Sequence, residues 1–167
     1  MSRPAGLRLA TRSAEETEAL GARLAAALPP SPQPLIVYLS GDLGAGKTTL
    51  ARGFTRECGF SGAVKSPTYT LIESHAGRAV TIVHLDLYRL REPAELESLG
   101  IRDLLLPAHV WLIEWPERGA GRLPPADLNI ALSVEPDRHG IEVQAVSQRG
   151  IEWLKRAGCS EGAPRFS

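Results

Sequence analysis

One run of eight residues has the composition of a phosphate-binding loop. It fits the pattern G-x-x-x-x-G-K-S/T at every fixed position and reads Gly41-Asp42-Leu43-Gly44-Ala45-Gly46-Lys47-Thr48. Glycines let the backbone curl so that successive N–H groups point at phosphate oxygens, and a following helix directs its positive end at the same anion. The Lys47 ammonium can reach the β- and γ-phosphates, and the Thr48 hydroxyl can coordinate magnesium. The loop therefore predicts ATP and Mg²⁺ as ligands.

Two acidic residues stand where strands are expected to end. Asp86 follows the apolar run at residues 79–85, and Glu114 follows the one at 110–113. In an open α/β sheet the ligand lies beyond the carboxyl ends of the strands, so both carboxylates could face the phosphate loop. There they could hold magnesium and orient an attacking water. The alternative for each acid is a solvated turn residue, which is the usual role of a single acid after a strand.

The loop stands between a predicted strand and a predicted helix. Residues 35–39 are apolar throughout, which is typical of a strand buried on both faces, and a helix is expected at 47–58 with Gly59 as its C-cap. Ser13 and Glu16 form a capping box for a helix at 14–28. Further strands are expected at residues 7–10, 69–73, 79–85, 110–113, 128–134 and 141–146, with helical turns at 93–99 and 151–156.

These elements predict a single-domain α/β P-loop fold with a mixed, mostly parallel central sheet flanked by helices. The domain is expected to span residues 1–157, and residues 158–167 are expected to be a disordered tail. A chain of 167 residues is long enough to form one core without metal or disulfide staples.

Composition narrows the range of partners. The 19 lysines and arginines balance the 19 aspartates and glutamates, so the chain lacks the basic excess of a protein that grips RNA through many phosphates. Any contact with a nucleic acid is therefore expected to be made mostly by another protein. Cys58 and Cys159 form neither a disulfide framework nor a zinc site. No apolar run approaches the roughly 20 residues that span a bilayer, and the N-terminus lacks a secretory signal, so a cytoplasmic protein without membrane contact is expected.

The segment Ser66-Pro67-Thr68 suggests a switch. Pro67 restricts Ser66 to extended geometry, and the Thr68 hydroxyl could then be recruited by a metal bound to the γ-phosphate. A plain loop before a strand is the alternative. Trp115 follows a predicted buried strand, a position where an indole usually serves packing.

The histidines offer no metal set. His75, His109 and His139 are expected in turns. His84 is expected to be a core or surface residue and not a catalyst.

Five segments together resemble the TsaE family, the bacterial ATPase component of tRNA threonylcarbamoyladenosine biosynthesis. They are Gly41-Asp42-Leu43-Gly44-Ala45-Gly46-Lys47-Thr48-Thr49, Val64-Lys65-Ser66-Pro67-Thr68-Tyr69, His84-Leu85-Asp86-Leu87-Tyr88-Arg89, Gly100-Ile101-Arg102-Asp103 and Ile113-Glu114-Trp115-Pro116. The resemblance extends over about residues 7–146. It implies weak ATP hydrolysis that increases with the TsaB–TsaD pair, which itself transfers the threonylcarbamoyl group to an adenosine beside the anticodon.

The loop motif and the resemblance together assign the site. Catalytic roles fall on Lys47, Asp86, Glu114 and Thr68, and magnesium on Thr48, Asp86 and Glu114. Contacts with ATP or ADP fall on Gly41, Leu43, Gly44, Ala45, Gly46, Lys47, Thr48, Thr49, Asp86 and Trp115, with Ala14 at the first helix start and Arg138 in the late hairpin turn.

Three other functions compete with this one. A small-molecule or nucleotide kinase needs a lid arginine, and Arg118 or Arg122 could serve. A GTPase would need an Asn-Lys-x-Asp segment, but Asn129, the one asparagine, precedes Ile130. A nucleotide-dependent scaffold, in which hydrolysis is incidental, is the third.

Overall fold

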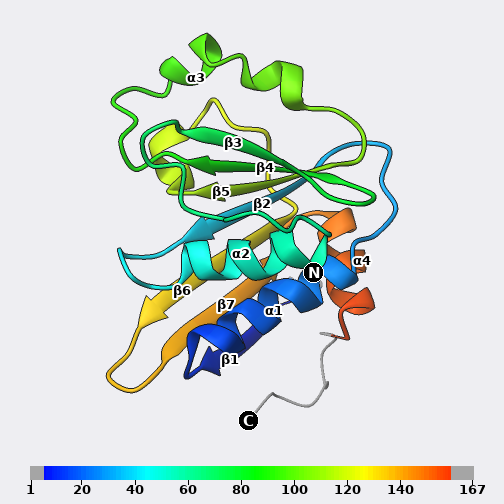
Figure 1. Cartoon of the computed structure of the whole chain (residues 1–167), viewed down its shortest axis with the longest axis vertical. Coiled ribbons are helices and arrows are strands. Elements are labelled where there is room, and N and C mark those ends of the chain that lie inside the picture. Colours follow the sequence, from blue (N-terminus) through cyan, green and yellow to red (C-terminus); the bar gives the residue numbers. More distant parts are fainter. Residues whose placement is uncertain (1–5, 159–167) are drawn as a thin grey trace, which may run out of the picture.

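A seven-stranded sheet runs through the protein in the order β1-β7-β6-β2-β5-β4-β3 (Figure 1). The computed structural model describes residues 6–158. The strands are β1 (Gly6–Thr11), β2 (Leu35–Ser40), β3 (Ile72–Ala76), β4 (Thr81–Asp86), β5 (His109–Glu114), β6 (Leu128–Val134) and β7 (His139–Ala145). The helices are α1 (Ala14–Ala26), α2 (Lys47–Glu57), α3 (Glu95–Ser98) and α4 (Gln148–Arg156), with 3₁₀ turns η1 (Ile101–Leu104) and η2 (Pro116–Gly119).

The centre of the sheet is parallel. Strands β6, β2, β5 and β4 are parallel neighbours, whereas β7 pairs antiparallel with both β6 and β1, and β3 pairs antiparallel with β4. Since β1 is antiparallel to β7, it points the same way as the four central strands, and only β7 and β3 run against them. The predicted mixed, mostly parallel sheet is confirmed.

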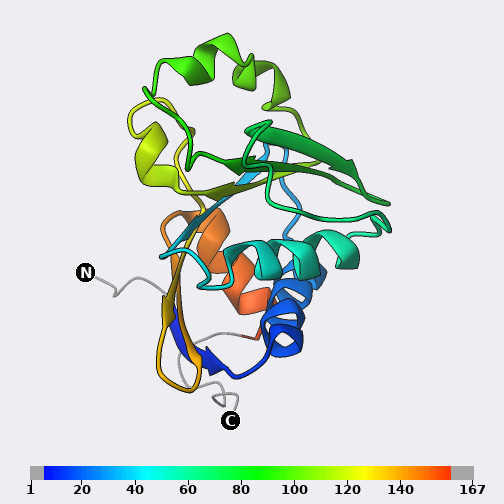
Figure 2. The same cartoon turned by 60° about the vertical axis from the view of Figure 1, so that its left-hand side comes forward.

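Helices cover the two faces unequally. Helices α1, α2 and α4 pack on one face, where Leu24, Phe54 and Trp153 share a core with Leu39 of β2 (Figure 2). The segment that carries α3 and η1 packs on the other face. Within the first layer, the buried Trp153 indole donates to the Leu24 carbonyl at 2.8 Å. The carboxyl ends of the parallel strands, between these two layers, remain open for a site.

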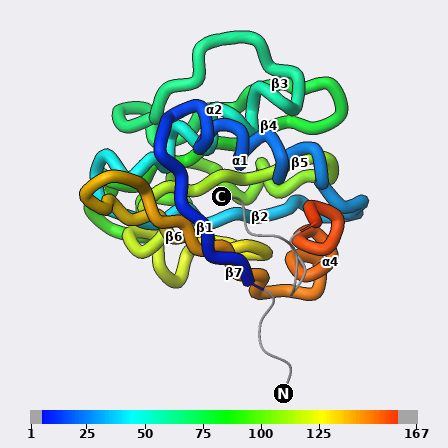
Figure 3. Tube along the Cα trace, turned by 90° about the horizontal axis from the view of Figure 1, so that it is seen from below, coloured from blue at the N-terminus to red at the C-terminus, as the bar shows by residue number. Residues whose placement is uncertain are grey.

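A close contact between α1 and α2 brings the start of α1 toward the phosphate loop (Figure 3). A Cβ built on Gly53 of α2 would lie 2.0 Å from the Glu18 carbonyl oxygen of α1, so no larger residue fits there. The start of α1 is fixed by the predicted capping box. The Glu16 N–H donates to the Ser13 hydroxyl at 3.1 Å, and the Arg12 N–H donates to the Glu16 carboxylate at 2.6 Å.

Some predicted boundaries were wrong. The strand expected at residues 69–73 begins only at Ile72, because residues 68–71 form a turn in which the Leu71 N–H donates to the Pro67 carbonyl at 2.7 Å. The turn expected at 75–78 lies later, where Gly77 donates to Val80 at 2.9 Å. The helix expected at 93–99 is shorter, and the final helix is longer because Ser147 caps it.

The expected tail falls almost wholly on residues 159–167, which lie outside the described part, as does Cys159. Across residues 6–158, no helix has both the length and the apolar character needed to cross a bilayer.

Candidate functional site

A cavity of about 550 Å³ lies at the carboxyl ends of the central strands, beside the start of α1. Its walls come from the phosphate loop, the first turns of α1 and α2, the ends of β4 and β5, and the first residue of β7. The lining residues are Arg12, Ser13, Ala14, Thr17, Leu43, Gly44, Ala45, Gly46, Lys47, Thr48, Thr49, Ser66, Thr68, Asp86, Glu114, Trp115 and His139. Segments more than a hundred residues apart in the chain thus meet around one space.

The phosphate loop joins β2 directly to α2. Gly41 has a φ of 139°, and a Cβ there would lie 2.2 Å from the Leu132 carbonyl oxygen of β6, so only glycine lets the loop pass this strand. The loop ends at Gly46, the N-cap of α2, with a φ of 106°. No side chain caps α2 and no acid stands in its first turn, whereas Ser13 caps α1 and Ser147 caps α4. The N-terminus of α2 is therefore available to an anion.

Lys47 lies under the loop in a buried position. Its ammonium donates to the Asp42 carbonyl at 2.9 Å and to the Gly41 carbonyl, and it lies 4.3 Å from the centre of the Trp115 ring. Burial lowers the pKa of Lys47, while the negative charges of Glu114 and Asp86 act in the opposite direction. The ammonium thus stands between the loop and the two carboxylates.

Glu114 faces α2 from the end of β5. Glu114 is 2% exposed, and its carboxylate accepts a hydrogen bond from the Thr48 hydroxyl, with Thr48 Oγ1 3.0 and 3.1 Å from its two oxygens. His84 Nε2 lies 2.7 Å from Oε2 of the same carboxylate. Because the Thr48 hydroxyl donates its hydrogen bond to Glu114, the lone pairs of the Thr48 oxygen remain available to bind a metal.

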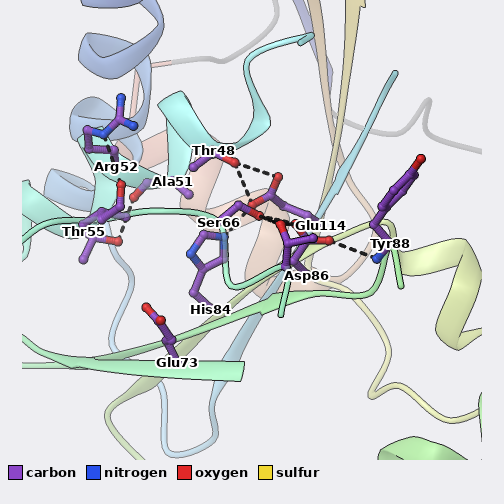
Figure 4. Close-up of polar contacts among 12 residues, drawn as sticks. Thr48, Ala51, Arg52, Thr55, Ser66, Glu73, His84, Asp86, Tyr88 and Glu114 are labelled. Atoms are coloured by element: carbon purple, nitrogen blue, oxygen red, sulfur yellow. Dashed lines mark hydrogen bonds and ion pairs between the residues drawn. The ribbon is translucent and has the colours of Figure 1, made fainter. Parts of the chain in front are cut away.

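Asp86 faces the same cavity from the end of β4. Its carboxylate accepts the Tyr88 N–H at 2.9 Å, the Thr68 hydroxyl at 3.3 Å and the Ser66 hydroxyl (Figure 4). The register pairs Asp86 with Glu114, so the two acids stand side by side on neighbouring strands. The segment at 66–68 is thereby tied to one of the acids across from the phosphate loop.

Two of the expected contact residues lie behind or outside the cavity. Gly41 supports the loop from behind and does not line the space. Arg138 is directed at Glu135, with its Nε 2.6 Å from the carboxylate, and also lies outside. The neighbouring His139 lines the cavity instead, and its Nδ1 lies 2.8 Å from the Ala45 carbonyl oxygen.

The sequence reasoning missed several residues of this region. His139 is the first residue of β7 and not part of a turn, and Arg12 and Thr17 flank the expected Ala14 on the cavity wall. His84 was expected to be a core or surface residue and not a catalyst; it is fully buried, and its contact with Glu114 was not foreseen. A signal for it existed, because it stands two positions before Asp86 and alternate residues of a strand share a face.

The residues of the competing functions lie elsewhere. Arg122 pairs with Glu97 at 2.6 Å, and the Arg118 guanidinium lies 5.5 Å from the centre of the Tyr88 ring. Neither arginine lines the cavity, and neither does Asn129 of β6.

Comparison with known proteins gives a consistent assignment. Residues 11–142 match the family model described as "Threonylcarbamoyl adenosine biosynthesis protein TsaE". Two relatives named "tRNA threonylcarbamoyladenosine biosynthesis protein TsaE" come from Haemophilus influenzae and Bacillus subtilis. The first is 49% identical over 116 residues, covering 70% of this chain and 73% of the relative. The second is 34% identical over 144 residues, covering 86% and 88%.

A solved structure has the same fold. The crystal structure of Bacillus subtilis YdiB superposes with a TM-score of 0.76 at 28% identity, covering 94% of this chain and 97% of that one. The residues matched by the family model, 11–142, include every residue that lines the cavity, from Arg12 to His139. The chain is therefore a member of the TsaE family.

Proposed function

We propose that this protein is a magnesium-dependent ATPase that supports threonylcarbamoyladenosine biosynthesis on tRNA. The observation that carries the proposal is the pairing of two features across one cavity. On one side the loop at residues 41–48 leads into the uncapped N-terminus of α2, and on the other stand the buried carboxylates of Asp86 and Glu114. The loop and the N-terminus of α2 suit an anion, and the two carboxylates suit a divalent cation.

The donor set suits magnesium bound to a nucleotide. Thr48, Asp86 and Glu114 offer only oxygen atoms, which Mg²⁺ prefers, and phosphate oxygens and waters complete such sites. Bound there, the ion would neutralise charge on the phosphates during transfer to water. The Lys47 ammonium, now bonded to loop carbonyls, would exchange these partners for phosphate oxygens.

The two carboxylates would have different tasks. Glu114, fixed by Thr48, would orient a water beside the nucleotide, because an ionised carboxylate accepts hydrogen bonds from it. Asp86 would hold the 66–68 segment by accepting hydrogen bonds from the Ser66 and Thr68 hydroxyls. It would release the segment when these hydroxyls bind the γ-phosphate or the metal instead. Trp115 would cover the phosphate end of the site, where it already packs on Lys47.

We further propose that hydrolysis is weak in the isolated protein and rises with a TsaB–TsaD pair in the cytoplasm. The names of the relatives place them in a tRNA modification pathway. The balanced charge of this chain favours protein partners over direct tRNA contact.

The test is ATP hydrolysis by the pure protein with and without TsaB and TsaD. We expect slow turnover alone and a severalfold increase with both partners. Lys47→Ala should reduce ATP affinity by at least about tenfold, because it removes the one cation that faces the phosphates from within the loop. Arg138→Ala serves as the control and should leave both quantities unchanged.

Two results would contradict the proposal. Unchanged ATP binding in Lys47→Ala would show that the loop at residues 41–48 does not bind the phosphates. Transfer of the γ-phosphate to a small acceptor in place of water would establish the kinase alternative.

A further inference from the structure

His84 is a fully buried histidine that contacts a carboxylate of the site. It lies on β4 with an exposure of 0%, and its Nε2 is 2.7 Å from Glu114 Oε2 (Figure 4). The register pairs Asp86 with Glu114 and His84 with Leu112, so His84 is the diagonal neighbour of Glu114. Alternate residues share a face, and His84 therefore stands on the same side of the sheet as Asp86.

The hydrogen bond fixes which ring nitrogen carries a proton. An ionised carboxylate only accepts hydrogen bonds, so Nε2 of His84 must be the donor to Glu114. The other ring nitrogen, Nδ1, is buried and has no hydrogen-bond partner within residues 6–158. Nε2 is therefore the nitrogen that links His84 to the site.

The bond adds a second restraint to the Glu114 side chain, which Thr48 already contacts. A glutamate has three rotatable bonds, and the Thr48 hydroxyl is shared between both oxygens of Glu114. The His84 N–H singles out Oε2 and leaves Oε1 to the other partners of the carboxylate. An apolar residue could fill the same position without burying a nitrogen that has no hydrogen-bond partner. Packing alone therefore does not explain a histidine here.

We propose that His84 is a positioning residue, whose Nε2–H holds Glu114 in the orientation needed to direct water at the nucleotide. This inference rests on the proposed ATPase function. Groups that orient the residues of a metal site through hydrogen bonds typically contribute 10–100-fold to activity, which sets the expected size of the effect at roughly that range.

The first experiment examines the hydrogen bond in the nucleotide-free protein. In ¹⁵N NMR of the imidazole rings, the His84 signals are identified by their loss in His84→Gln. We expect a proton on Nε2 and a shift of the Nε2–H signal in Glu114→Ala. An Nε2 without a proton, or no response to Glu114→Ala, would overturn the proposal whether or not the protein hydrolyses ATP.

The second experiment separates positioning from folding. His84→Leu removes the donor, while His84→Gln retains an N–H of similar reach. We expect His84→Leu to lower kcat about 10–100-fold with ATP affinity within about twofold of wild type, and His84→Gln to recover part of the loss. His109→Gln is the control and should keep wild-type turnover, because His109 lies at the opposite end of β5 and its ring Nδ1 is 2.9 Å from the Pro107 carbonyl oxygen.

A double-variant comparison identifies the route of the effect. If His84 acts through Glu114, His84→Leu should cause no further loss of turnover in a Glu114→Ala background. An equal loss in both backgrounds would overturn the proposal. If His84→Leu does not fold, the NMR result and the turnover of His84→Gln still test the proposal for His84.

Absence of ATP hydrolysis in the wild-type protein would refute the proposed function. The hydrogen bond between His84 and Glu114 would then be tested by the NMR experiment alone.

Discussion

Asp86 accepts three hydrogen bonds, two of them from the hydroxyls of Ser66 and Thr68. Neutral hydroxyls bind a carboxylate less strongly than cations do, and they give up such bonds readily to a metal or to phosphate oxygens. The partners of Asp86 therefore suit a residue whose contacts change during a reaction cycle.

Substituting Thr68 tests that role. Thr68→Ala should lower ATP turnover by about tenfold, since it removes a hydroxyl from the cavity wall where the γ-phosphate of the proposed nucleotide would lie. Affinity for ADP should stay within about twofold, because Thr68 has no bond to the phosphate loop. Steady-state hydrolysis and calorimetric ADP titration measure the two quantities. The exposed neighbour Thr70 provides the control, as Thr70→Ala, and equal losses of both quantities in Thr68→Ala would argue against a γ-phosphate sensor.

Trp115 offers an optical signal of binding. Its ring lies 4.3 Å from the Lys47 ammonium and 5.0 Å from the Tyr88 ring, whereas Trp111 and Trp153 are completely buried. In the proposed site, bound phosphate would draw Lys47 away from the ring, so ADP should change the tryptophan emission of the wild-type protein. Trp115→Phe should lose most of that change, and retention of the full change would place its source at another tryptophan.

Single residues differed in how well the sequence predicted them. Lys47 and Thr48 belong to a contiguous motif, so the residue types and their spacing were enough to assign both to one site. The partners of His84 and His139 stand 30 and 94 residues away in the chain, and only the sheet register brings those pairs into contact. Arg138 and His139 are adjacent, and which of the two turns toward the loop depends on the hairpin geometry.

Among the elements, α1 contacts α2 closely, and the start of α1 forms one wall of the cavity. Gly53→Ala should lower the free energy of unfolding by about 1–3 kcal/mol, because the new Cβ would meet the Glu18 carbonyl oxygen at 2.0 Å. Displacement of α1 should also weaken ATP binding, since Arg12, Ser13 and Ala14 line the cavity.

Urea denaturation and nucleotide titration measure the two effects of Gly53→Ala. Glu57→Ala, an exposed change on the same helix, should alter stability by less than about 0.5 kcal/mol. Unchanged stability in Gly53→Ala would mean that the two helices can separate without cost.

The strands that are buried on both faces were the best predicted elements. Strands β2 and β5 read as continuous apolar runs because both of their faces are covered, and they were predicted to within one residue at each end. The start of β3 was wrong because Leu71 adopts a φ of 66°, a conformation that the surrounding Thr-Leu-Ile pattern does not indicate. The antiparallel pair β6–β7 was expected, but its hairpin turn is tighter than the sequence suggested.

The whole molecule should gain stability when its cavity is filled. A ligand present at 100 times its Kd stabilises the folded state by about 2.7 kcal/mol, which for a domain of this size corresponds to roughly 5–10 °C in Tm. ATP with Mg²⁺ should therefore raise Tm by about that amount in a thermal scan. Lys47→Ala should show a much smaller rise, and an equal rise in both proteins would place the ligand outside the phosphate loop.

The fold class was predictable because a phosphate loop between a buried strand and a helix occurs in parallel α/β sheets. The strand order was not, because β2 lies between β5 and β6, which follow it by about 70 and 90 residues and carry no pairing signal in their apolar residues. The same long-range order creates the cavity wall formed by His139.

The support of the phosphate loop by β6 and β7 bears on how the protein is synthesised. Gly41 lies against Leu132 of β6, and His139 of β7 contacts the Ala45 carbonyl. A nascent chain that has emerged from the ribosome only to residue 120 already contains the whole motif, but it lacks both supports. We therefore expect the proposed nucleotide binding only once translation of the domain is nearly complete, with no ATP held by unfinished chains.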